Sequence, residues 1–228
     1  DNGAVQNESG ILVGADWNVT RGLSLMAYTD FVYFSHLRFG AHTASKAWDN
    51  LLMLTYIRQR WSLLARYRLR IREKDNAEKT ALVNELTQRG RFSLTYSADS
   101  WSCKSQLDIA ASSYLNRSFG YMLSESGTWM PLSWLSLTST LGYFHTADFS
   151  SRIYIYERGP LYSFSFPSFF GRGMRYSLFV RADFSSHLML ILRSSTTHYF
   201  DRNHVSSGLQ QVNSSTLSGL DIQLRWRF

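Results

Sequence analysis

The last nine residues of the sequence, LDIQLRWRF at 220–228, alternate between apolar and polar side chains without a break. This period of two is that of an extended strand, in which successive side chains point to opposite faces. One face would carry only apolar groups, Leu220, Ile222, Leu224, Trp226 and Phe228, and the other only charged or amide groups, Asp221, Gln223, Arg225 and Arg227. The stretch therefore predicts a strand that lies between an apolar and a polar environment.

The same alternation recurs upstream, most regularly in 61–72. The polar face of that stretch carries four arginines at alternate positions, Arg66, Arg68, Arg70 and Arg72. Weaker segments complete a set of about twelve predicted strands. They span 10–18, 22–35, 48–59, 61–73, 89–99, 101–116, 118–130, 133–147, 151–157, 173–185, 187–200 and 215–228.

Breaks of two kinds separate these segments. The tight ones are 18–22, 59–60, 99–100 and 131–132, and the extended ones are 36–47, 74–88, 158–172 and 201–214. Short turns at one end, long loops at the other and long strands are typical of a membrane barrel. The sequence therefore predicts an all-β fold, a transmembrane antiparallel up-and-down β-barrel of about twelve strands or the carboxy-terminal part of a larger one. One short helix is predicted inside a loop, at 77–87.

Composition supports this class and excludes others. Of the 228 residues 15% are aromatic and only 18% are charged, so the fold must accommodate many rings. The single cysteine, Cys103, provides neither a disulfide framework nor a cysteine-based zinc site. No apolar run approaches the roughly 18 residues that a transmembrane helix needs, and residues 1–10 lack the features of a secretory signal. We expect a single domain over 1–228, either mature or cut from a longer protein whose amino-terminal part is missing.

Periodicity alone does not say which face is wet, because soluble β-sandwiches and lipocalin-like barrels also alternate, with the apolar face inward. A barrel of about twelve strands is too wide for apolar side chains to fill, however, and tryptophans gather near the predicted strand ends. We therefore expect the apolar residues of 220–228 to face lipid. The expected lumen-lining residues are Arg66, Arg68, Arg70, Arg72, Asp221, Gln223, Arg225 and Arg227. A soluble β-sheet binding module stays open as an alternative.

The arginines of 66–72 have two interpretations inside a lumen. Either they form an anion-attracting wall, or they pair with carboxylates of neighbouring strands. The candidate partners are Asp16, Asp30, Asp108, Glu125, Asp183 and Asp221. Pairing is favoured because interior charges cost less when they are matched. Nucleic acid is not an expected partner, since side chains that face a lumen cannot reach a duplex.

The alternating end of the chain, with its aromatic last residue, resembles the final strand of bacterial outer-membrane barrels, which the barrel-assembly machinery recognises. Three further stretches, RIYIYERG (152–159), FSFPSFFG (164–171) and YFDRNH (199–204), resemble the carboxy-terminal barrel of Bacteroidetes outer-membrane proteins that carry an amino-terminal helix-hairpin-helix segment. The resemblance implies a location in the bacterial outer membrane, with its lipids and the assembly machinery as partners. The helix-hairpin-helix segment, which in relatives suggests DNA binding or uptake, has no counterpart in this sequence.

One motif suggests a catalytic function. The stretch NHVSSG (203–208) is similar to the Asn-His-x-Ser-x-Gly pattern of outer-membrane phospholipase A, a barrel enzyme that hydrolyses lipid esters. By that resemblance His204 would be the base and Ser206 the nucleophile. The family's third member, an amide on the following strand, has no convincing match, because Asn213 is too near in sequence and the following strand offers Ser218.

The favoured function is therefore a non-enzymatic, porin-like outer-membrane barrel with a structural, transport or complex-forming role. The alternative is a phospholipase-like serine hydrolase that uses Ser206 and His204. No spacing of histidine, cysteine and carboxylate residues completes a metal site, and no phosphate-loop motif occurs, so neither a metal nor a cofactor is expected. The aromatic loop 160–171 either folds over the barrel mouth or contacts a partner protein.

Overall fold

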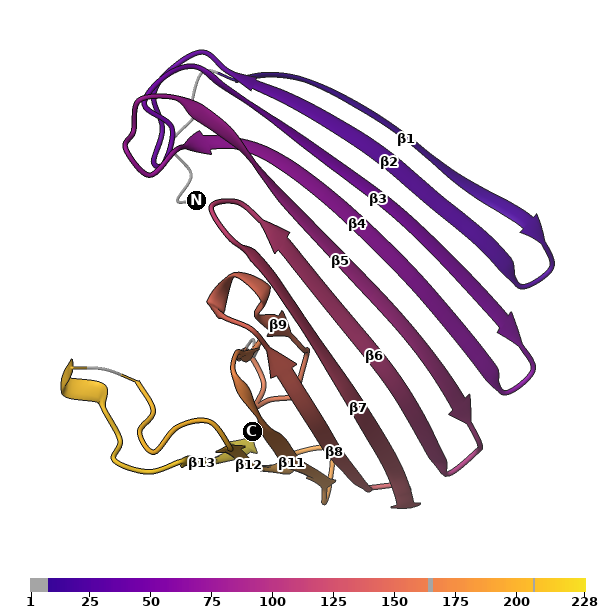
Figure 1. The fold of residues 1–228 in the computed structure, drawn as a ribbon. Coiled ribbons are helices and arrows are strands. Elements are labelled where there is room, and N and C mark those ends of the chain that lie inside the picture. The colour runs from indigo at the N-terminus through magenta and orange to yellow at the C-terminus, as the bar shows by residue number, and fades with distance from the viewer. Residues whose placement is uncertain (1–7, 164–165, 207) are drawn as a thin grey trace.

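The computed structural model describes residues 8–163, 166–206 and 208–228. Eleven strands form one sheet in sequence order, and Figure 1 shows this sheet curved into a trough. Its strands are β1 (Glu8–Thr20), β2 (Leu23–Phe34), β3 (Ser45–Arg58), β4 (Trp61–Asp75), β5 (Leu82–Ser97), β6 (Trp101–Ser113), β7 (Arg117–Leu132), β8 (Leu135–Thr146), β11 (Arg172–Asp183), β12 (Leu188–Tyr199) and β13 (Thr216–Trp226). A two-stranded ribbon, β9 (Ile153–Tyr154) with β10 (Ser168–Phe169), is separate from it. Two 3-10 turns, η1 (Phe149–Ser151) and η2 (Gly208–Gln210), lie in the connections.

The predicted all-β, antiparallel up-and-down fold is confirmed. Each strand of the main sheet pairs in antiparallel register with the strand beside it, and each overlaps a predicted segment, although β5 begins at Leu82 and not at the predicted position 89. The connections at one end of the trough are tight turns, such as the one between β1 and β2. The longest connections, 147–171 and 200–215, join strands at the other end.

The sheet is not closed into the expected ring. Within the described residues β1 pairs only with β2, and β13 only with β12. Of the twelve predicted strands, 151–157 is the one that does not join the sheet: it forms only the short β9, which pairs with β10. Eleven strands remain, so β1 and β13 run in the same direction. An antiparallel ring needs an even number of strands, so this sheet cannot close on itself with antiparallel pairing.

The predicted helix at 77–87 is wrong. Asn76 closes a turn in which its side-chain Oδ1 accepts hydrogen bonds from the backbone N–H groups of Thr80 (2.8 Å) and Ala81 (3.3 Å). Strand β5 then begins at Leu82, opposite Asp75 of β4. The extended loop expected at 74–88 is therefore a hairpin turn. Pairing along β4 outweighs the local helix propensity of these residues.

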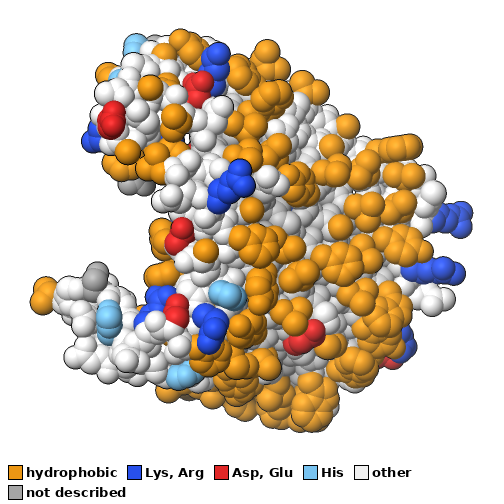
Figure 2. Space-filling view, in the orientation of Figure 1, with side chains coloured by type: hydrophobic (Ala, Val, Ile, Leu, Met, Phe, Trp, Pro, Cys, Tyr) orange, Lys and Arg blue, Asp and Glu red, His pale blue; other side chains and the backbone are white. Residues whose placement is uncertain are grey.

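The two faces of the sheet are unlike. On the convex face of β13, Leu220 and Trp226 are each 68% exposed and Ile222 and Leu224 are 64% exposed. Figure 2 shows hydrophobic side chains over much of the outer surface of the sheet. On the concave face, polar side chains such as Asp108 and Arg175 are buried. A soluble sheet has the opposite arrangement, because it buries its apolar face.

A connection between β8 and β11 folds back onto the concave face. We call its described residues, 149–163 and 166–171, the inner segment. Its buried side chains form a small core with residues of β6, β7, β8 and β12. This core comprises Ile153, Ile155 and Phe169 of the inner segment with Ala110, Met122, Phe144 and Tyr199, joined by Val205. Residues 160–163 and 166–171 of the expected aromatic loop are part of the inner segment, whereas 164–165 lie outside the described residues. Leu161 packs against a second buried cluster that contains Phe179.

The inner segment divides the concave face into two halves. Along β6–β8 and β11–β12 most inward side chains are buried, and we call this part the filled half. Along β1–β5 most inward side chains are half-buried or exposed, and we call this part the open half.

Candidate functional site

The open half carries a dense row of arginines. Strand β4 points Arg66, Arg68, Arg70 and Arg72 inward, as the period of two requires, and β5 adds Arg89 and Arg91 beside them. We call these six side chains the arginine face. All of them except Arg91 border a groove of about 700 Å³. Its lining residues are Arg66, Arg68, Arg70, Arg72, Lys74, Glu85, Thr87, Arg89, Ser112, Tyr114, Ser150, Arg152 and Tyr154.

Pairing between β4 and β5 sets like charges opposite each other. Arg66 lies directly opposite Arg91, and Arg68 directly opposite Arg89. Facing residues of an antiparallel pair have their Cβ atoms about 4.5–5.5 Å apart, and like charges at such positions destabilise the sheet. The register between β4 and β5 therefore concentrates positive charge in the arginine face.

Carboxylates match only part of this charge. Asp49 of β3 accepts hydrogen bonds from Arg68 Nε (2.8 Å) and Arg70 Nε (3.1 Å). Asp108 of β6 accepts one from Arg91 Nε (2.6 Å). Among the described residues, no carboxylate lies within ion-pair distance of Arg66, Arg72 or Arg89.

The carboxylates that the sequence suggested as partners are mostly elsewhere. Asp221 pairs with Arg193 and Asp183 with Arg181, neither of which belongs to the row at 66–72. Glu125 accepts a hydrogen bond from Ser105 Oγ (2.8 Å), and both of these residues lie on the convex face. The actual partner of the row, Asp49, was not among the candidates.

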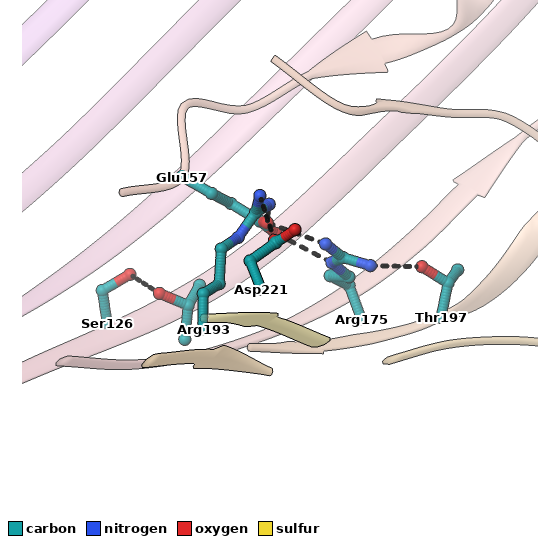
Figure 3. Close-up of polar contacts among 7 residues, drawn as sticks. Ser126, Glu157, Arg175, Arg193, Thr197 and Asp221 are labelled. Carbon is teal, nitrogen blue, oxygen red and sulfur yellow. Dashed lines mark hydrogen bonds and ion pairs between the residues drawn. The ribbon is translucent and has the colours of Figure 1, made fainter. Parts of the chain in front are cut away.

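In the filled half the charges are closely matched (Figure 3). Glu157 of the inner segment is 4% exposed. Its Oε1 accepts from Arg175 Nε (2.8 Å), and its Oε2 accepts from Arg175 Nη2 (2.7 Å) and Arg193 Nη2 (2.7 Å). Arg175 Nη1 also donates to Thr197 Oγ1 (2.9 Å), and Arg193 lies 3.5 Å from a carboxylate oxygen of Asp221.

This network sets the protonation of Glu157. Burial raises the pKa of the carboxyl, but the hydrogen bonds and charges of Arg175 and Arg193 more than offset that effect. The pKa of Glu157 is therefore held below its ordinary value of 4.5, and the side chain is a carboxylate at neutral pH. Glu157 thus fixes the inner segment to both β11 and β12.

Further hydrogen bonds hold the inner segment at two other points. Arg91 Nη2 donates to the carbonyl oxygen of Tyr154 (3.1 Å), on the side of the open half. The backbone N–H of Leu161 donates to Gln223 Oε1 of β13 (2.6 Å), and Gln223 Nε2 donates back to the carbonyl oxygen of Leu161 (3.4 Å). The segment is therefore tied to strands on both sides of the filled half.

The polar residues of the last strand lie as the alternation predicts, except at the end. Asp221, Gln223 and Arg225 have their register partners Arg193, Ile191 and Met189 on the concave face. Arg227 and Phe228 follow the end of β13, and the backbone N–H of Arg227 donates to the carbonyl oxygen of His187 (2.9 Å).

The candidate catalytic pair lies in the loop between β12 and β13. His204 and Ser206 flank Val205, which forms an isolated bridge with Val212, and both of their side chains are exposed. Ser206 has a φ of 65°, so the alternation of a strand does not apply to the pair. No hydrogen bond joins the two side chains within the described part of the chain. Ser207, inside the motif, lies outside the described residues.

The residues considered for the third catalytic position are engaged locally. Asn213 Oδ1 accepts from Gln211 Nε2 (3.0 Å), and the Ser218 hydroxyl lies 3.0 Å from that of Thr196. The motif therefore presents separate loop side chains and no proton relay that the described residues reveal.

Across the described residues, no group of three histidine, cysteine or carboxylate side chains is placed to hold a metal ion. No described helix is long and apolar enough to cross a membrane. Comparison of the chain with models of protein families, with curated proteins and with solved structures gave no match. The resemblance to helix-hairpin-helix outer-membrane proteins and to the phospholipase motif therefore stays a prediction.

Two residues of the arginine face, Arg89 and Arg91, were not predicted from the sequence. Arg89 and Arg91 alternate with Gly90 and Phe92, so the period of two was a usable signal for them. No local signal marks Asp49, because its role depends on the register between β3 and β4.

Proposed function

We propose that this chain forms the wall of an integral barrel in the bacterial outer membrane, with a structural, transport or complex-forming role and without enzymatic activity. The observation that carries the proposal is the polarity of the sheet: apolar side chains are exposed on its convex face while charged side chains are buried on its concave face. An extended apolar surface in water favours association or aggregation, whereas acyl chains solvate it.

Strand length supports the same function. The shortest strand of the sheet, β13, has 11 residues, and the longest, β5 and β7, have 16. A tilted strand crosses a membrane with about 9–11 residues. Every strand of the sheet can therefore span the hydrocarbon layer and extend beyond it.

Aromatic rings near both ends of the strands are a second support. At the turn end, Trp61 packs on Tyr96 with ring centroids 4.9 Å apart, and Tyr96 packs on Trp101 at 5.2 Å. At the loop end, Tyr121 lies 6.3 Å from Tyr143. Membrane barrels carry such girdles at both interfaces, because amphipathic rings favour the level of the lipid headgroups.

The open edges support a place in a wider barrel. Because β1 and β13 run in the same direction, antiparallel completion requires an odd number of additional strands between them. We infer that such strands complete the wall, and that the chain is the carboxy-terminal part of a larger barrel.

Adjacent leucines at the middle of β3 test the orientation. Leu52 lies on the convex face and is 48% exposed, whereas Leu51 is opposite Arg68 on the concave face. In a lipid-facing sheet, Leu52→Glu opposes insertion by up to about 2 kcal/mol. We expect it to lower the membrane-inserted fraction in vesicles, measured by flotation and protease protection, while Leu51→Glu inserts normally. A soluble sheet would tolerate glutamate at the exposed Leu52, and equal insertion of both variants would contradict the proposal.

The completion of the wall is tested by cross-linking. Val13 on β1 and Ile222 on β13 are both exposed residues of edge strands, and Cys103 is the single native thiol. In a Cys103→Ser background we expect Val13→Cys and Ile222→Cys to resist joining by a short bis-maleimide within one chain. An efficient intramolecular link would show instead that β1 closes directly on β13.

A further inference from the structure

The groove of the open half is lined by charge of almost one sign. Seven basic side chains border it, against one carboxylate, Glu85. That carboxylate is already engaged, since Glu85 Oε1 accepts a hydrogen bond from Lys74 Nζ (2.9 Å). We propose that the arginine face is a binding site for a small polyanion, a ligand that carries several phosphate or sulfate groups.

The facing arginines give the site its driving force. The pairs Arg66–Arg91 and Arg68–Arg89 face each other across β4 and β5, and the two carboxylates at the edges of the face leave Arg66, Arg72 and Arg89 without an ion pair among the described residues. A bound anion between the two strands converts repulsion into charge-assisted hydrogen bonds. Guanidinium groups suit phosphate and sulfate because their planar fork binds two oxygens at once.

The inner segment supplies a second, fixed wall. Arg152 Nε donates to the hydroxyl oxygen of Tyr154 (2.6 Å), and the Arg152 guanidinium lies 4.1 Å from the ring centroid of Phe149. The guanidinium of Arg89 lies 5.3 Å from the ring centroid of Tyr154. The ring of Tyr154 therefore contacts a cation from each wall of the groove, Arg89 and Arg152, which keeps their charged groups positioned without neutralising them.

Spacing decides between one anion and several. Arginines at alternate positions of a strand are about 7 Å apart, and those on the paired strand lie about 5 Å to the side. One phosphate can bridge two neighbouring guanidiniums but cannot reach the whole row. The cavity of about 700 Å³ has the size of an ordinary small-molecule site. A compact ligand with several anionic groups matches both its size and its charge.

The site belongs to the concave face, so it does not depend on what covers the convex face. Binding can be measured in detergent solution, and failure of membrane insertion would leave the result interpretable. The probes are inositol hexakisphosphate and inositol hexakissulfate, which distinguish phosphate from sulfate recognition. Orthophosphate at the same total phosphate concentration serves as the control ligand that carries a single phosphate group.

The test compares two pairs of substitutions by calorimetric titration. We expect Arg66→Gln with Arg89→Gln to weaken binding of inositol hexakisphosphate at least tenfold and to flatten its dependence on salt. The control, Arg60→Gln with Arg181→Gln, removes two arginines that pair with Asp99 and Asp183 outside the groove, and we expect affinity within twofold of the parent. Equal weakening in both pairs would reduce the site to general surface charge and overturn the proposal.

Thermal unfolding separates a ligand site from a structural role. Without ligand, removal of Arg66 and Arg89 relieves like-charge contacts, so the variant should unfold at the parent temperature or above it. With inositol hexakisphosphate only the parent and the control should gain stability. If the double variant does not fold, Arg72→Gln is measured in its place with the same expectation of weakened binding. Orthophosphate binding as tight as that of inositol hexakisphosphate, or an unchanged affinity in the arginine variants, would contradict a polyanion site.

Discussion

The filled and open halves of the concave face differ in how far the charges of their arginines are neutralised. In the filled half, Arg175 and Arg193 share one carboxylate, Glu157, which the inner segment carries into the trough. In the open half, the same segment carries in another cation, Arg152, beside arginines that already face each other. Charges with a carboxylate partner from the same chain serve the fold. Charges without one are available to a ligand.

The largest expected effect comes from removing the carboxylate of the filled half. Glu157→Gln leaves the buried guanidinium of Arg175 without its negative partner, and we expect a loss of about 3 kcal/mol in unfolding free energy. Denaturant unfolding of the detergent-solubilised protein measures it. The matched control in the open half is Glu85→Gln, whose ion pair with Lys74 is more exposed and should contribute about 1 kcal/mol or less. A similar loss in both variants would remove the distinction between the halves.

Packing density should also differ, between the filled half of the concave face and the edge strand β13. A Cβ added at Gly120 would lie 2.6 Å from Thr146 Cγ2 and 2.8 Å from the carbonyl oxygen of Ser151, so Gly120→Ala forces the inner segment away from β7. We expect a loss of about 2 kcal/mol, as for other overpacked interiors. At Gly219 of β13 the added Cβ would meet only Ser195 Oγ, at 3.6 Å, so Gly219→Ala should change the unfolding midpoint little. An unchanged midpoint for Gly120→Ala would mean that the inner segment is loosely held.

Acid should weaken the filled half through Glu157. Because the pKa of this carboxyl is lowered in the folded state, its contribution is fully present above pH 4.5 and is lost as the pH falls through the folded pKa. The parent should therefore lose stability below pH 4.5 more steeply than Glu157→Gln does. Unfolding curves at a series of pH values between 7 and 3 measure the difference, and parallel profiles would contradict this assignment.

The smallest effect is expected at the loop motif. Ser206→Ala changes an exposed side chain outside both halves, so we expect no change in unfolding midpoint or in membrane insertion. Phospholipid vesicles with the parent protein should release no fatty acid above the level of the variant. Release that disappears in Ser206→Ala would revive the hydrolase alternative.

Much of the fold was accessible from the sequence because strand pairing leaves a direct mark on it. The alternation in 61–72 identified both β4 and its inward arginines, and the alternation in 220–228 separated the exposed apolar residues of β13 from Asp221 and Gln223. The helix predicted at 77–87 failed because propensity is local, whereas the pairing of Leu82 and its neighbours with β4 is not.

Only part of the candidate site could be predicted from the sequence. Asp49 and Glu157 became partners of arginines through register and through the path of the inner segment, neither of which is written in a local pattern. The same path removed 151–157 from the sheet, and with it the even strand number on which ring closure depends.

The shared direction of the two edge strands also limits how copies of this chain can associate. Both β1 and β13 run from the loop end of the trough to its turn end. If copies of the chain insert into a bilayer in the same orientation, the edge strands that meet run in the same direction. Every strand pair between copies would then be parallel. Association of such copies therefore cannot extend the antiparallel sheet. Only a strand that runs in the opposite direction can form an antiparallel pair with β1 or β13.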